Sequence, residues 1–195
     1  WRPLGESDKD AFRSPLPQEG AGLRAAYADF LQFAKPFPFG QYTRRFWGWA
    51  GGVGTADGVL ASLLNAALHS PVIIHHHAGT WIDIQVLDWM REALGFPAGT
   101  AGNLTSGGSM ANFTGLAVAR HVRGGAHIRS KGVGRARYAV YGSSATHYSI
   151  PKSLDLLGLG ERAFREIPVN DDFQLDPNLL DAAILRDGRK GYRPI

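Results

Sequence analysis

The sequence contains no cysteine, and this absence removes several classes of protein from consideration. A disulfide scaffold is excluded, as is any zinc or iron–sulfur site that uses cysteine ligands. The sequence also lacks the run of roughly 18 apolar residues that a membrane-spanning helix needs, so a membrane is not expected as a partner. Because a reducing compartment suits a chain without cysteine, a cytoplasmic location is expected.

Charge is also sparse, since charged residues make up 19% of the sequence and the formal net charge is +4. Much of the positive charge lies in one segment, 120–137, which is interrupted by glycine and contains no phenylalanine, tyrosine or tryptophan. This composition predicts a solvated loop, and a nucleic-acid-binding patch is the alternative; nucleic acid is not an expected partner. The basic residues of the segment include Arg120, His121, Arg123, Arg129, Lys131, Arg135 and Arg137.

What the sequence does contain is enough apolar material for a core, with 44% hydrophobic residues in 195, and an unusual amount of glycine, 25 residues. These numbers indicate one globular domain, or one domain and part of another. The sequence begins with Trp1 rather than methionine and stops at Ile195, where a strand is expected to begin. We therefore expect it to be a piece of a longer protein.

One stretch, 103–120, combines a short expected strand, a glycine turn and a helical pattern. Asn103 to Ser106 is expected to be the strand end, and Gly107 and Gly108 allow a tight turn with positive φ. Free backbone N–H groups and the positive end of the helix dipole would then point at one place, which suits a phosphate. The alternative is a helix capped by Ser106 or Ser109 that binds no ligand.

The rest of the sequence predicts an N-terminal segment of arm and helices, 1–97, followed by an α/β domain, 98–195. Residues 1–20 are polar and contain three prolines, which favours an extended arm. From residue 103 onward, strands and helices alternate, which predicts a largely parallel sheet with ligands at the carboxyl ends of its strands. Helices are expected over 23–33, 57–69, 80–94, 148–157 and 176–186, and strands over 138–141, 164–169 and from 195.

Two further patterns resemble known sites without matching them. Gly52-x-Gly54-x-x-x-Gly58 departs from a dinucleotide fingerprint, because Asp57 stands where the third glycine belongs and no apolar strand precedes it. Three consecutive histidines, His75 to His77, would point in alternate directions along a strand, so no metal site is expected.

The aromatic-rich segment 37–49 is expected to pack against a core or a partner, and the alternative is that it forms the wall of a pocket.

Several segments taken together resemble group II pyridoxal-phosphate-dependent amino-acid decarboxylases, the family of the aromatic-amino-acid, tyrosine, glutamate and diaminobutyrate decarboxylases. The resemblance runs from about residue 20 to residue 195, with the segments in the same order and spacing. It implies the aspartate-aminotransferase-like type I fold, an incomplete α/β large domain preceded by a helical segment, and a homodimer. The segments are 45–49, 58–61, 85–89 with 94–97, 105–112 and 147–152 with 156–160.

The resemblance also assigns roles to residues. It implies that pyridoxal 5'-phosphate (PLP) is the cofactor and an L-amino acid the substrate, which loses its carboxyl group. Gly108 and Ser109 would hold the cofactor phosphate, and His147 would stack on the pyridine ring and reach the substrate as a catalytic residue. No metal is implied. The substrate pocket would be lined by Trp49, Gly51, Gly52 and Thr80.

This chain departs from the family pattern at Trp81 and Met110, where many relatives have glutamate, and those departures leave the choice of amino acid open. The aromatic segment and the small residues 50–52 favour an aromatic or bulky substrate. None of the five lysines has the His-Lys context of the family's Schiff-base lysine, so the isolated chain is expected to be inactive. The alternative function is a non-catalytic phosphate-binding module or an inactive fragment.

Overall fold

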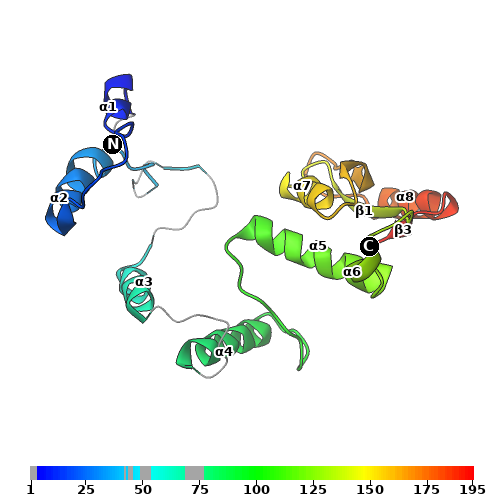
Figure 1. Cartoon of the computed structure of the whole chain (residues 1–195). Coiled ribbons are helices and arrows are strands. Elements are labelled where there is room, and N and C mark those ends of the chain that lie inside the picture. Colours follow the sequence, from blue (N-terminus) through cyan, green and yellow to red (C-terminus); the bar gives the residue numbers. More distant parts are fainter. Residues whose placement is uncertain (1–3, 42, 44–45, 49–53, 69–76) are drawn as a thin grey trace. The chain divides into compact units, whose positions relative to one another are not determined.

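The structure is a computed structural model that describes residues 4–41, 43, 46–48, 54–68 and 77–195 (Figure 1). The chain forms two compact units, residues 1–73 and 74–195, and each is described here by itself. This division precedes the helix over 78–93, whereas the sequence places the domain boundary after it, at 97/98. The start of the cofactor domain at residue 98 therefore stays a prediction.

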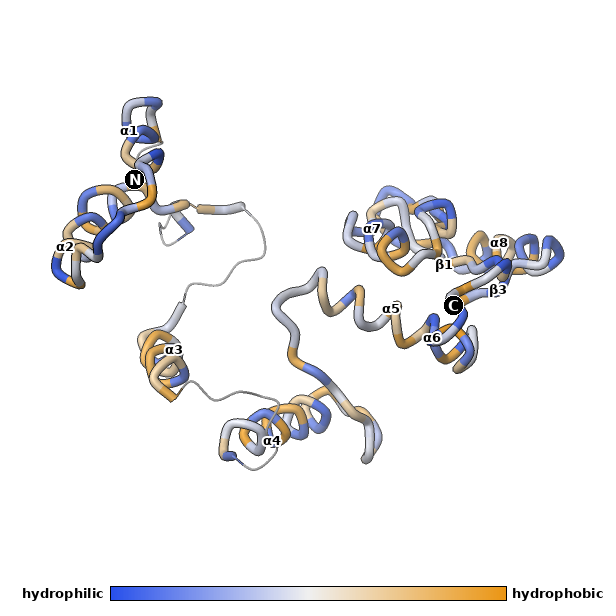
Figure 2. Tube along the Cα trace, in the orientation of Figure 1, coloured by the Kyte–Doolittle hydropathy of each residue, from blue (hydrophilic) through white to orange (hydrophobic). Residues whose placement is uncertain are grey.

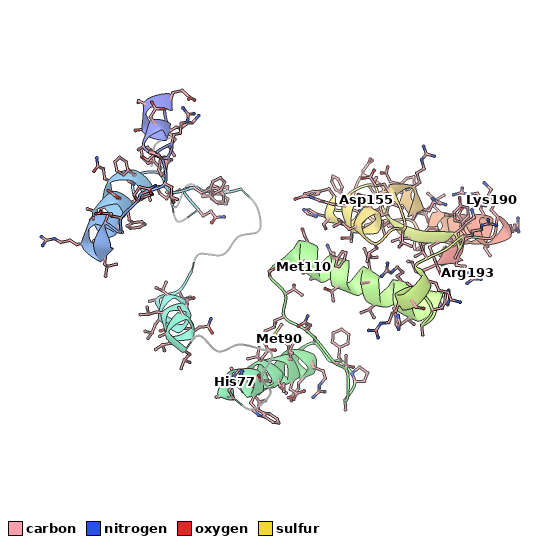
Figure 3. The ribbon with its side chains drawn as sticks, in the orientation of Figure 1. His77, Met90, Met110, Asp155, Lys190 and Arg193 are labelled. Carbon is pink, nitrogen blue, oxygen red and sulfur yellow. The ribbon has the colours of Figure 1, made fainter. Side chains whose placement is uncertain are left out.

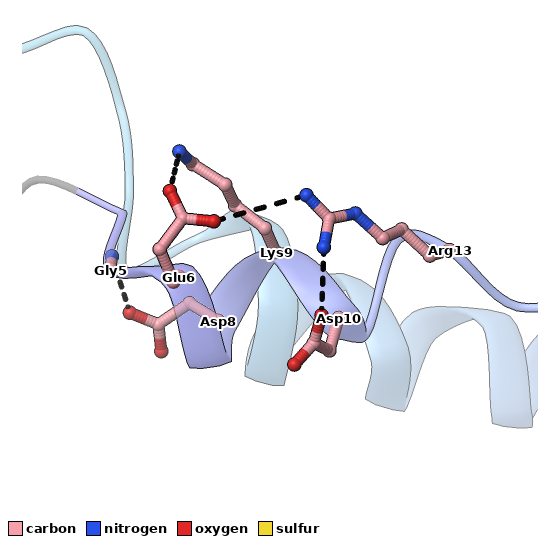
Figure 4. A network of polar contacts seen from close by, with 6 residues as sticks. All are labelled: Gly5, Glu6, Asp8, Lys9, Asp10 and Arg13. Atoms are coloured by element: carbon pink, nitrogen blue, oxygen red, sulfur yellow. Dashed lines mark hydrogen bonds and ion pairs between the residues drawn. The ribbon is translucent and has the colours of Figure 1, made fainter.

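The N-terminal unit begins with a short helix, α1 (Glu6–Asp10), where the sequence predicted an extended arm. That prediction was wrong for these residues because close polar contacts favour a helical turn (Figure 4). The side chain of Asp8 accepts the Gly5 N–H at 2.9 Å. Lys9 then pairs with Glu6 at 2.6 Å, and both side chains are exposed, so this pair adds little stability.

The predicted helices of this unit are present. α2 (Gly22–Asp29) continues into a π-helical turn, η1 (Phe30–Ala34), and the two together cover the segment 23–33. α3 (Ala56–Leu68) begins after Thr55, whose hydroxyl accepts the Gly58 N–H at 3.1 Å. The apolar residues of α3 are exposed in this chain, and the helix is largely apolar in Figure 2.

The second unit starts with α4 (Ala78–Ala93), which ends where the sequence predicted, since Gly95 follows its C-cap with φ 70°. Among the described residues, no helix has the length and apolar character needed to cross a bilayer. The remaining elements, in chain order, are α5 (Gly108–Gly124), α6 (Ile128–Lys131), β1 (Tyr138–Ser143), α7 (Ser149–Leu156), η2 (Glu161–Ala163), β2 (Phe164–Ile167), α8 (Pro177–Arg189) and β3 (Arg193–Pro194).

The sheet has three parallel strands in the order β2-β1-β3. Val140 of β1 pairs with Phe164 of β2, and Tyr138 pairs with Arg193 of β3. The order β1-α7-β2-α8-β3 confirms the predicted alternation and the parallel sheet. The expected strand over 103–106 is absent, because no neighbouring strand pairs with this segment in the part of the chain that the structure describes.

The core lies between the sheet and the helices α5 and α7. Val140, Leu154 and Ala163 are buried together, with Leu116 of α5 packed against them. α8 starts as predicted, because Asp176 is the N-cap, its side chain accepts the Asn178 N–H at 2.8 Å, and proline follows it.

The basic segment 120–137 is only in part the solvated loop that its composition predicted, because most of its basic side chains are exposed but 120–124 belong to α5 and 128–131 form α6. Arg120 and Arg123 lie on α5 rather than after it. Arg120 Nη1 donates to the carbonyl oxygen of Leu157 at 2.6 Å, at the C-terminal end of α7. Arg137 Nη2 donates to the Tyr192 hydroxyl oxygen at 2.6 Å. These arginines satisfy backbone and side-chain acceptors within the second unit, and the charge pattern alone does not reveal those partners.

Candidate functional site

The turn that opens α5 has the geometry of a helix start without a side-chain cap. Gly107 is the N-cap, with φ 156° and ψ 170°, a conformation that is open essentially only to glycine. The Thr105 hydroxyl donates to the Gly107 carbonyl oxygen at 3.1 Å and braces the turn. The prediction of positive φ is confirmed for Gly107, but it was wrong for Gly108, which is already helical.

The first turn of α5 is suited to an anion. No side chain caps the helix, so the predicted alternative of a cap by Ser106 or Ser109 was wrong. The first turn also carries no acidic residue that would repel a phosphate. Gly108 and Ser109 are exposed there, and a helix N-terminus concentrates N–H donors and positive potential. Met110, also in this turn, is labelled in Figure 3.

His147 lies in the turn between β1 and α7 and is held there by Ser149. Its Nδ1 is 2.9 Å from the Ser149 hydroxyl oxygen and accepts the Ser149 backbone N–H at 3.2 Å. The Asn112 side chain on α5 donates to the same hydroxyl oxygen at 2.9 Å. The imidazole ring also lies beside the Tyr148 ring, with centroids 4.2 Å apart and planes tilted by 36°. His147 itself is exposed, while Ser149 is buried.

A pocket of about 360 Å³ connects these two features. It brings Ser109, from the turn that opens α5, to one wall with Ser149, which holds His147. Lys152 contributes an ammonium group and is exposed, as the sequence predicted. The full lining is Ser109, Met110, Phe113, Tyr148, Ser149, Lys152, Ser153 and Leu156.

Of the other predicted site residues that the structure describes, Gly108, His147 and Thr80 are not among those that line this pocket, although Gly108 and His147 are close in sequence to residues that do. Thr80 is half-buried in the first turn of α4, and its hydroxyl lies 3.4 Å from His77 Nε2. Trp49, Gly51 and Gly52 lie outside the described residues, so their assignment to a substrate pocket stays a prediction, as does that of Thr80.

Sequence reasoning missed Asn112 and Ser149. Asn112 stands in the motif 105–112 and Ser149 follows His147 by two residues, so both were adjacent to residues that were singled out. Their contact joins positions 37 residues apart, and no periodicity or spacing rule reports such a contact.

A second polar cluster lies at the other side of the sheet, between β1, β2 and α8. Arg165 Nε donates to Asp187 Oδ2 at 2.6 Å, and the Tyr141 hydroxyl donates to the same oxygen at 3.2 Å. Burial alone would raise the pKa of Asp187, but the hydrogen bond and charge of Arg165 outweigh it and lower that pKa. Burial, followed by the charge and hydrogen bond of Asp187, raises the pKa of Tyr141 to about 12.

Tyr192 lies against two guanidinium groups of this region. The Arg137 guanidinium carbon is 4.0 Å from the centroid of the Tyr192 ring, and that of Arg165 is 4.6 Å from it. The hydrogen bond from Arg137 is the main cause that lowers the pKa of Tyr192. This cluster joins β1, β2 and α8 to Tyr192, which directly precedes β3, and no residue of it lines the pocket at Ser109.

Comparison with known proteins gives concordant results. The conserved domain of pyridoxal-dependent decarboxylases matches residues 55–195. An aromatic-L-amino-acid decarboxylase of Bacillus atrophaeus is 28% identical over 204 residues, covering 99% of this chain and 40% of that protein. An L-2,4-diaminobutyrate decarboxylase of Rhizobium meliloti (strain 1021) is 31% identical over 185 residues, and the match covers 93% of this chain and 36% of that protein. The chain thus spans about two fifths of the length of these curated relatives.

Solved structures show the same fold. Mouse CSAD in its apo form superposes with a TM-score of 0.89 at 21% identity, covering 100% of this chain and 41% of that one. Oryza sativa TDC, solved with PLP and tryptamine, superposes with a TM-score of 0.80 at 22% identity, and the match covers 98% of this chain and 43% of that one. The likeness confirms the expected type I fold of PLP-dependent enzymes, of which this chain holds part. The match of the conserved domain over 55–195 places this chain in the pyridoxal-dependent decarboxylase family.

Proposed function

We propose that the protein carrying this sequence removes the carboxyl group of an L-amino acid with the help of PLP. The observation that carries the proposal is the start of α5, where Gly107, Gly108 and Ser109 form an uncapped turn without an acidic residue. This donor set fits a phosphate, and it lies within the segment that matches the family's conserved domain. The curated relatives named above are decarboxylases of amino acids.

The residues of the chain would divide the work as follows. The first backbone N–H groups of α5, with the Ser109 hydroxyl, would bind the phosphate, and His147 would offer its ring face and its free nitrogen. When bound, PLP supplies an electron sink for the electrons left behind as the carboxyl group departs as CO2. Met110 and Phe113 would limit the access of water to the pocket beside Ser109.

Four finer points belong to the same proposal. The protein works as a homodimer in the cytoplasm, and the exposed apolar residues of α3 support a covering partner surface. Thr80, Trp49, Gly51 and Gly52 line the substrate pocket. The 195-residue chain alone releases no CO2, because none of its five lysines stands in the expected His-Lys context.

A titration with PLP followed by a substrate panel tests the proposal. The full-length protein is mixed with PLP, and binding is followed by the change in cofactor absorbance. Release of CO2 is then measured with aromatic, basic, acidic and small L-amino acids. Saturable binding with CO2 release from at least one of them is expected. Binding without CO2 release from any L-amino acid would favour the alternative of a phosphate-binding module, and no binding at all would overturn both.

A further inference from the structure

Three polar groups form a chain of hydrogen bonds from α5 to His147. Asn112 Nδ2 lies 2.9 Å from the Ser149 hydroxyl oxygen, and that oxygen lies 2.9 Å from His147 Nδ1. The Ser149 backbone nitrogen is 3.2 Å from the same Nδ1. Ser149 is only 2% exposed, so water competes little for these bonds.

Two of these hydrogen bonds can run in only one direction, because their nitrogen atoms can donate but cannot accept. A backbone N–H can donate but cannot accept, so Nδ1 of His147 must be the acceptor of the Ser149 N–H. The amide nitrogen of Asn112 likewise only donates, and it occupies an acceptor position on the Ser149 hydroxyl oxygen. The hydroxyl proton of Ser149 is then available for Nδ1, which receives two donors.

This direction selects one tautomer of the ring. A neutral imidazole carries a single proton, and a ring that accepts at Nδ1 must carry that proton on Nε2. The opposite tautomer would bring the Nδ1 proton against the Ser149 backbone N–H and lose that bond. Within the described part of the chain, no hydrogen bond is made to Nε2 of His147, so its proton remains available to a ligand.

We propose that Asn112 and Ser149 are positioning residues that hold neutral His147 as the Nε2–H tautomer. The ring then presents an N–H donor, which an anionic acceptor such as the carboxylate of an amino acid can take. The part concerning the ligand rests on the proposed function, while the tautomer itself is a property of this chain.

Nuclear magnetic resonance of the imidazole nitrogens tests the tautomer directly. Histidines of the full-length protein are labelled with ¹⁵N and long-range ¹H–¹⁵N correlations are recorded without PLP, at about pH 8.5, where histidine is ordinarily neutral. A His147→Gln variant identifies the His147 signals. We expect the pattern of the Nε2–H tautomer. The pattern of the Nδ1–H tautomer in the unaltered protein would overturn the proposal without any further variant.

Two substitutions show whether Asn112 and Ser149 cause that preference. Ser149→Ala removes the hydroxyl donor, and Asn112→Asp turns the hydroxyl proton away because a carboxylate accepts it. Each should move the tautomer ratio toward Nδ1–H by about two- to tenfold, the worth of one hydrogen bond. Ser153→Ala is the matched control, since its hydroxyl donates to the Ser149 carbonyl oxygen at 2.6 Å, and it should leave the ratio unchanged. An unchanged ratio in both test variants would overturn the positioning role.

The PLP titration separates this inference from the proposed function. If the unaltered protein shows the Nε2–H tautomer but binds no PLP, the proposed function fails, and the positioning role of Asn112 and Ser149 stands. If it binds PLP and releases CO2 while Ser149→Ala and Asn112→Asp leave the tautomer ratio unchanged, the positioning role of Asn112 and Ser149 fails, and the proposed function stands.

Discussion

Arg165 and Asp187 form an ion pair that fastens β2 to α8, with Arg165 Nε 2.6 Å from Asp187 Oδ2. Their side chains are 19% and 5% exposed, so both charges have lost most of their contact with water. The same carboxylate accepts a hydrogen bond from Tyr141 on β1. One aspartate therefore ties two of the three strands to the helix that follows them.

Removal of the Asp187 charge should destabilise the second unit strongly. Asp187→Asn leaves the guanidinium of Arg165 without its counter-charge in a largely buried site, and such a change costs about 3 kcal/mol. The free energy of unfolding, measured by urea denaturation with circular dichroism, should fall by that amount. Asp181→Asn, at an exposed position on the same helix, is the control and should change little. Equal effects of the two substitutions would contradict the assignment.

The same carboxylate should make stability depend on pH in the acid range. Arg165 holds the pKa of Asp187 below its ordinary value, which is about 3.9. A lowered pKa in the folded state means that the contribution of Asp187 is present above pH about 4 and is lost as the pH falls through the folded pKa. The unfolding free energy of Asp187→Asn should therefore fall less steeply below pH about 4 than that of the unaltered protein.

The pKa values of two tyrosines are shifted in opposite directions, so Tyr192 should ionise at a lower pH than Tyr141. The pKa of Tyr141 is raised to about 12, so Tyr141 should remain protonated where ordinary tyrosines ionise, at pH about 10. The pKa of Tyr192 is lowered by Arg137, so Tyr192 should ionise earlier. Phenolate absorbance should lose its latest step in Tyr141→Phe and its earliest in Tyr192→Phe. Because the folded pKa of Tyr141 is raised, its contribution to stability should be lost between pH about 10 and about 12.

A carboxylate at the start of α5 should raise the stability of the helix and lower the affinity for the cofactor. Ser109→Asp places a negative charge near the helix N-terminus and should stabilise α5 by about 0.3–1 kcal/mol. The same charge would repel a phosphate, so the affinity for PLP should drop by at least about tenfold, which corresponds to about 1.4 kcal/mol. Ser109→Asn is the neutral control. Unchanged PLP affinity in Ser109→Asp would place the phosphate elsewhere.

Gly142, near the end of β1, should not tolerate a side chain. A Cβ atom there would lie 2.7 Å from Phe164 Cε2 and 2.7 Å from Thr146 Oγ1. Gly142→Ala should therefore cost about 1–3 kcal/mol and displace the turn that leads to His147. The matched control is Gly188→Ala in α8, where a Cβ meets open space and alanine should stabilise the helix by about 0.5–1 kcal/mol. Thermal unfolding of both variants measures the contrast.

Features with a local cause could be predicted from the sequence. The start of α8 follows from Asp176 and its proline, and the end of α4 follows from Gly95, because caps involve residues a few positions apart. The turn at Gly107 was predicted for the same reason. The helix α1 was not predicted although its causes are local: the three prolines of 1–20 favour an extended chain, whereas the pairs of Glu6 with Lys9 and of Asp10 with Arg13 favour a helical turn between them.

Features that depend on a distant partner could not be predicted in this way. A strand requires a neighbour, so the residues at 103–106 could not show that no strand pairs with them in the described part of the chain. The partners of Arg120 and Arg137 lie 37 and 55 residues away, and a list of charges contains no such information. The family resemblance predicts roles for Ser109 and His147, but the hydrogen bonds made to His147 depend on the packing of α5 on α7 and could not be predicted from it.

Helices α5 and α7 are bound together at two points with the same spacing on each. Asn112 and Arg120 lie eight residues apart on α5, and their partners Ser149 and Leu157 lie eight residues apart along α7. At about 1.5 Å per residue, both intervals measure about 12 Å, so the two helices run in the same direction in fixed register. Neither can slide along the other without breaking both bonds. The position of Ser149 beside His147 therefore depends on a register that Arg120, two turns from Asn112, helps to fix.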